Sequence, residues 1–120
     1  MRRRPGIHPC LGVPPAERQR IALVCRLALA ELTGADPAQA LTDLHAAARV
    51  LRELVAGDRF TDDARQTAQE ARQAVESAMA GTALPAAALG PATAAVELLE
   101  LVLPLVTWRR LEAAKVATRG

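Results

Sequence analysis

The chain has 120 residues, the length of one domain, and its 51% hydrophobic and 23% charged residues are ordinary globular usage. Alanine and leucine dominate with 27 and 17 copies, whereas there are two isoleucines, one phenylalanine, one tryptophan and no tyrosine. Such a composition favours helices and excludes an all-β fold. The 15 basic and 13 acidic residues nearly cancel, which excludes nucleic-acid binding by overall positive charge alone.

The first 13 residues hold two prolines, two glycines and no helical periodicity. They predict an extended or mobile N-terminal arm (1–13) in front of a single helical domain over residues 14–120. The first helix is expected to begin at Pro14 or Pro15, because proline loses no hydrogen bond in a first turn. It is expected to end at Thr33, with Gly34 as a left-handed cap.

Two further helices follow, each with its own start and stop signals. Asp36 supplies a capping carboxylate and Pro37 a first helical residue, so the second helix is predicted from Pro37 to Ala56. Thr61 is expected to cap the third helix, which runs to Ala80 before a glycine.

The last predicted helix runs from Pro91 to Thr118, after a linker over 82–90 that could hold a short helical turn around 86–89. Pro104 lies within its apolar pattern and predicts a kink or a split, because proline lacks the backbone donor. The predicted fold is therefore all-α: a compact bundle of about four main helices, with sequential neighbours antiparallel.

The first and last helices are apolar around most of their circumference, which predicts that they lie side by side in the middle of the bundle. Even there, the second and third helices cannot cover all of this surface, and a homodimer is expected to cover the remainder. The tryptophan and two arginines of the last helix also suit a contact surface. The predicted protein interface comprises Leu23, Leu27, Leu98, Leu101, Leu105, Trp108, Arg109 and Arg110.

These features predict a non-enzymatic helical protein-binding module that self-associates and acts as an inhibitor or adaptor. Fourteen arginines against one lysine, with abundant alanine, indicate a bacterial or phage origin. Two cysteines are too few for a disulfide scaffold, which indicates the cytoplasm. Export is the alternative, but Arg26 interrupts the apolar stretch that a signal peptide needs. The apolar run 96–106 falls short of the roughly 20 residues of a membrane span, so no membrane is expected as a partner.

The alternative function is nucleic-acid binding by a helix-turn-helix-like regulator. Its candidate contacts are an arginine-rich arm and two arginines of the third helix: Arg2, Arg3, Arg4, Arg65 and Arg72. The third helix also carries four acidic residues, which would repel phosphate.

No catalytic residue, cofactor or metal site is expected, because no nucleophile–base pair, phosphate-binding glycine loop or redox cysteine pair is present. The residues His8, Cys10, Cys25 and His45 are of the types that bind zinc, but they do not come in the close pairs that a structural zinc site uses. Glu97 and Glu100 share a helix face without the accompanying histidine that a carboxylate metal site uses.

Overall fold

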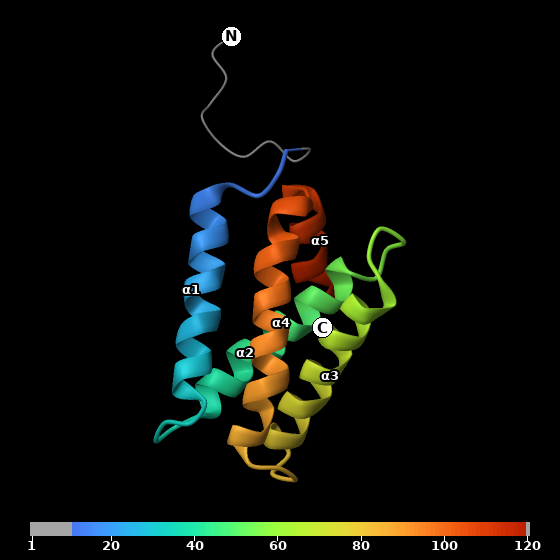
Figure 1. Cartoon of the computed structure of the whole chain (residues 1–120). Helices are drawn as coiled ribbons and strands as arrows, with labels where there is room; N and C mark the ends of the chain where they lie inside the picture. The colour runs from blue at the N-terminus through green and yellow to red at the C-terminus, as the bar shows by residue number, and fades with distance from the viewer. Residues whose placement is uncertain (1–10, 120) are drawn as a thin grey trace.

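Five α-helices follow one another along residues 11–119, the part of the chain that the structure, a computed structural model, describes (Figure 1). They are α1 (Pro15–Glu31), α2 (Ala38–Leu54), α3 (Asp62–Met79), α4 (Leu89–Val102) and α5 (Trp108–Ala117), with 3-10 turns η1 (Pro85–Ala88) and η2 (Leu103–Leu105) on either side of α4. No strand occurs over these residues. The all-α prediction is confirmed, and the structure has five helices rather than the four main ones expected.

The fifth helix arises because the predicted last helix is divided at Pro104. The proline lies in η2, and Val106 then adopts an extended conformation with φ −111° and ψ 158°. Thr107 caps the new helix: its Oγ1 accepts a hydrogen bond from the Arg110 amide at 3.1 Å. The proline and this second cap together turn the chain, which gives α5 its own direction.

The other helix ends show which of the predicted capping residues do cap a helix. Thr61 caps α3 by accepting from the Ala64 amide at 3.2 Å. Gly81, after α3, has φ +80° and is the one residue with positive φ among residues 11–119. The left-handed cap expected at Gly34 is therefore wrong; the Gly34 amide instead bonds to the Glu31 carbonyl at 2.9 Å in a tight turn.

The second helix lies at the centre of the molecule, because α2 packs against α1, α3, α4 and α5 (Figure 1). Leu51 in its last turn and Val55 just after it are fully buried, and Leu44, Ala48 and Leu54 are 2% exposed. The expectation that the first and last helices occupy the middle is thus wrong. The third helix approaches α2 and α4 through Ala68, Ala71 and Val75, whose small side chains permit close packing.

The end of the predicted arm contacts this helical core. Val13 is 4% exposed, Gly12 forms a bridge with Thr107, and the Leu11 carbonyl accepts the Trp108 amide at 2.8 Å. Residues 11–13 therefore pack where α5 begins. Residues 1–10 lie outside the described part, so the division into an arm and a domain stays a prediction.

We expect Val13→Ala to lower the free energy of unfolding by about 1–3 kcal/mol, because it removes buried methyl groups. Leu11→Ala is the matched control: Leu11 is 61% exposed, so its loss should change stability by less than about 0.5 kcal/mol. Urea denaturation followed by circular dichroism measures both. Equal effects of the two substitutions would contradict the packing of Val13.

Candidate interaction surfaces

An apolar stripe lies on the outer side of α1. Leu23 and Leu27 are 59% and 57% exposed, and they lie opposite the buried side that carries Cys25, Ala28 and Leu29. Two exposed alanines, Ala16 and Ala30, extend the stripe along the helix. The predicted interface residues on this helix are therefore accessible to a partner.

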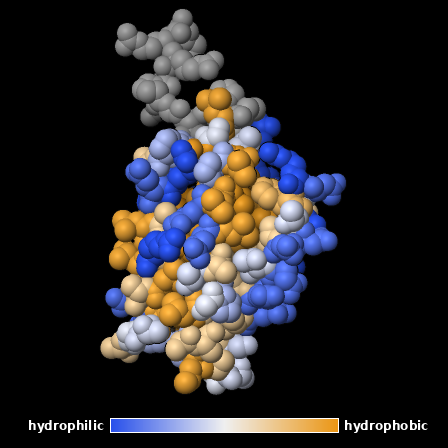
Figure 2. Space-filling model, in the orientation of Figure 1, coloured by the Kyte–Doolittle hydropathy of each residue, from blue (hydrophilic) through white to orange (hydrophobic). Residues whose placement is uncertain are grey.

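A second stripe lies on α4 and the turn after it. Leu101 is 69% exposed and Leu105 is 58% exposed, while Leu98 is partly buried against the core. Figure 2 shows apolar surface over α4 and at the outer edge of α1, with hydrophilic surface between them. The structure thus exposes four of the five predicted leucines, in two groups, and leaves Leu98 partly buried.

An ion pair between α1 and α4 separates these groups. The Arg26 guanidinium donates to both carboxylate oxygens of Glu100, at 3.0 Å from Nε and 2.6 Å from Nη2. Both side chains remain partly exposed, at 47% and 31%, so this contact contributes modestly to stability. It accounts for Glu100, which the sequence offered as half of a carboxylate pair.

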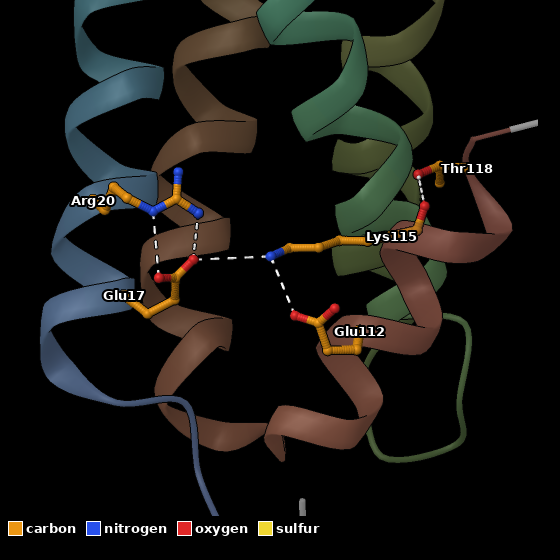
Figure 3. A network of polar contacts seen from close by, with 5 residues as sticks. All are labelled: Glu17, Arg20, Glu112, Lys115 and Thr118. Atoms are coloured by element: carbon orange, nitrogen blue, oxygen red, sulfur yellow. Dashed lines mark hydrogen bonds and ion pairs between the residues drawn. The ribbon is translucent and has the colours of Figure 1, made fainter. Parts of the chain in front are cut away.

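Polar contacts also join α1 to α5 (Figure 3). Glu17 accepts hydrogen bonds from Arg20 on its own helix and lies 3.9 Å from Lys115 Nζ, which also contacts Glu112 at 3.5 Å. The bonds from Arg20 hold the pKa of the Glu17 carboxyl below its usual value. Lys115 Nζ lies 5.4 Å from the centre of the Trp108 ring.

The three predicted interface residues of α5 have different surroundings. Trp108 is half-buried and packs against the core, and its amide holds Leu11. Arg110 donates to the Glu53 carbonyl near the end of α2, whereas Arg109 is exposed. Only Arg109 therefore presents its side chain freely; Trp108 and Arg110 have structural contacts.

The candidate nucleic-acid contacts on α3 are also used within the fold. Arg65 Nη1 donates to the carbonyls of Val55, Gly57 and Phe60 at 3.4, 3.2 and 3.0 Å. The guanidinium thus binds carbonyls at and beyond the end of α2, where the helix dipole is negative. Arg2, Arg3 and Arg4 lie outside the described residues.

Arg72, the second arginine proposed for nucleic acid, forms an ion pair with Glu76 at 3.0 Å. Glu76 also lies 2.9 Å from His45 Nε2 on α2. The hydrogen bond with His45 and the charge of Arg72 hold the pKa of the Glu76 carboxyl below its usual value. This cluster links α2 to α3 and leaves Arg72 poorly placed to meet phosphate.

A pocket of about 350 Å³ opens between α1, α2, α4 and α5, which sequence reasoning missed because its walls come from distant segments. Its lining includes Ile21, Val50 and Leu111, with Arg20 and Lys115 among the polar lining groups. Cys25 also lines it, and burial raises the pKa of this thiol to about 11. The thiol is therefore protonated and unreactive at neutral pH.

Among residues 11–119, no group of three or more histidine, cysteine, aspartate or glutamate side chains could hold a metal ion. Of the zinc ligands considered, Cys25 is buried in the core and His45 faces Glu76, while His8 and Cys10 fall in the undescribed segment. One helical run in the described chain, Pro85–Leu105, is long and apolar enough to cross a membrane. It is longer than the run 96–106, and 39% of its most apolar stretch is buried inside the protein.

Comparison of the chain with protein-family models, with curated proteins and with solved structures finds no match.

We expect Arg65→Ala to lower the free energy of unfolding by about 1–2 kcal/mol, because the carbonyls of Val55, Gly57 and Phe60 lose a charged hydrogen-bond donor. The effect stays modest because the guanidinium is partly exposed to solvent. Arg59→Ala, at an exposed loop position, should change it by less than about 0.5 kcal/mol. Thermal unfolding measures both variants. If Arg65→Ala leaves stability unchanged but weakens binding to duplex DNA in a salt-dependent manner, the arginine is a phosphate contact instead.

Proposed function

We propose that this chain is a non-enzymatic helical module that binds proteins, including a second copy of itself, through the apolar stripes of α1 and α4. The observation that carries the proposal is the exposure of Leu23, Leu27, Leu101 and Leu105, each between 57% and 69%. Its cellular role is that of an inhibitor or adaptor in the cytoplasm of a bacterium, or one encoded by a phage.

The hydrophobic effect favours the burial of these surfaces against a partner. Removing a leucine side chain from water contributes about 1.5–3 kcal/mol when burial is complete. Four such side chains on one chain are more than isolated exposed leucines, since they form two stripes on neighbouring helices. Exposed apolar side chains grouped in this way are typical of protein-interaction sites.

Nucleic-acid binding remains the alternative proposal, with a narrower basis. Arg65 and Arg72 have partners within the fold, so the alternative depends on Arg2, Arg3 and Arg4. These three arginines could form a phosphate-binding arm next to an otherwise balanced domain.

Self-association is testable by light scattering at micromolar concentration. We expect a mass of about twice 12.7 kDa, and at least one of Leu27→Arg and Leu101→Arg should reduce it to 12.7 kDa, because a buried unpaired charge opposes the contact. Thr42→Arg, at an exposed position on α2, should leave the mass unchanged. A parent protein of 12.7 kDa would overturn the self-association part of the proposal.

Recovery of the tagged protein from its native cells distinguishes the two functions. We expect a co-purifying protein to survive nuclease treatment and to be lost in a variant with Leu23, Leu27, Leu101 and Leu105 all changed to serine. A variant with alanine at Arg2, Arg3 and Arg4 should retain it. Recovery that depends on nucleic acid and on these arginines would support the alternative instead.

A further inference from the structure

The outer side of α1 has the residue spacing of a helix that pairs with another helix. Residues 16, 20, 23, 27 and 30 follow one another at steps of four, three, four and three, and all five are exposed. This is the heptad spacing by which two helices keep one stripe in mutual contact. Leu23 and Leu27 occupy its centre, and Ala16 and Ala30 allow close approach near its ends.

We propose that α1 pairs with α1 of a second copy in antiparallel orientation about a twofold axis. The inference rests on the self-association proposed above and specifies its surface. With the axis near residue 25, Leu23 packs against the partner subunit's Leu27, and Leu27 against the partner subunit's Leu23. A twofold contact of this kind covers the same stripe on both copies and closes the assembly as a dimer.

The charges on α1 favour this orientation over a parallel one. Parallel pairing in register would place Arg20 opposite the partner subunit's Arg20 within the stripe, and the two like charges would repel, although Glu17 beside each Arg20 reduces this repulsion. Antiparallel pairing places Arg20 opposite the partner subunit's Ala30 and beside the partner subunit's Glu31. Arg20 and Glu31 are both exposed and lie on the same flank of the stripe. Arg20 also donates to Glu17 on its own helix, so the attraction to Glu31 is added to that pair and occurs twice in each dimer.

The two flanks near the axis are compatible with close contact. Val24, which is 41% exposed, lies on one flank and meets its own copy there. Arg26 lies on the other flank and approaches the partner subunit's Arg26. Glu100 already offsets the charge of each Arg26 through the bidentate contact at 2.6 and 3.0 Å. The ion pair therefore reduces the one repulsion that the geometry creates.

This pairing leaves the second apolar stripe accessible. Leu101 and Leu105 lie on α4 and the turn after it, and hydrophilic surface separates the apolar surface over α4 from that at the outer edge of α1 (Figure 2). In the proposed dimer, α1 holds the two copies together, and the α4 stripe of each copy remains open to a different protein.

Charge reversal tests the pairing. We expect Arg20→Glu and Glu31→Arg each to raise the dimer dissociation constant about three- to tenfold, because each replaces attraction by repulsion at two sites. The double variant Arg20→Glu/Glu31→Arg should restore it to within about threefold of the parent. Arg52→Glu/Glu70→Arg, at exposed positions on α2 and α3, controls for the reversal of charge elsewhere. Sedimentation velocity measures the constants, and circular dichroism verifies folding.

The outcomes separate this inference from the proposed function. If the parent dimerises but the double variant is no better than the weaker single variant, the α1 pairing is wrong and self-association stands. If Leu101→Arg dissociates the dimer and Leu27→Arg does not, the contact belongs to α4. A parent that is monomeric throughout overturns both the pairing and the self-association.

Cysteine substitution tests the orientation independently, in a Cys10→Ser background. An Arg20→Cys chain mixed with an Ala30→Cys chain should form a mixed disulfide in oxidised glutathione, since antiparallel pairing brings these positions within disulfide range. Arg20→Cys alone should remain uncrosslinked. A rapid disulfide between two Arg20→Cys chains would show parallel pairing and overturn the proposal.

Discussion

The contact of α2 with each of the other four helices is the constraint on which the rest of the structure depends. This helix contacts α1, α3, α4 and α5, and in the view of Figure 1 it crosses behind α4. Its leucines are 0–6% exposed, so the four remaining helices each turn one side toward it. On α1 and α4 an outer side stays uncovered, although it carries apolar residues: Leu23 and Leu27 on α1, and Leu101 on α4.

The carbonyl end of α2 shows how this central position is stabilised. Arg65 donates to the carbonyls of Val55, Gly57 and Phe60, and Arg110 donates to that of Glu53. Two arginines from different helices thus complement the negative end of the helix dipole. Their charges serve the fold and are correspondingly less available to a partner, which favours apolar contacts over nucleic-acid contacts as the basis of function.

The sequence predicted the helices well where a local signal acts alone. Thr61 caps α3 as expected, and Pro104 interrupts the last helix as expected. Gly34 was misjudged because a glycine after a helix permits a left-handed cap without requiring one. The sequence also predicts the wrong helices at the centre, because α2 lies there instead of the first and last helices. A helix that is apolar around most of its circumference is expected to be buried, but its sequence does not show whether the same chain or another chain buries it.

The candidate interaction surfaces could be predicted in part from the apolar residues of the helices. Leu23, Leu27, Leu101 and Leu105 are exposed in the structure, as an interface requires. Their division into two stripes was not predictable, because the pair Arg26–Glu100 joins residues 74 positions apart. The roles of Arg110 and Arg65 at the end of α2 likewise depend on tertiary contacts that no local pattern encodes.

In the proposed dimer, a second copy of the chain covers the leucines on the outer side of α1. Nuclear Overhauser effects between differently labelled copies test it most directly, in a sample that mixes protein with ¹³C-labelled leucine methyl groups and unlabelled protein. The account predicts intermolecular contacts from Leu23 methyl groups to Leu27 methyl groups of the other copy. Leu23 and Leu27 methyl groups that show contacts only within one copy, in a sample at dimer-forming concentration, would contradict it.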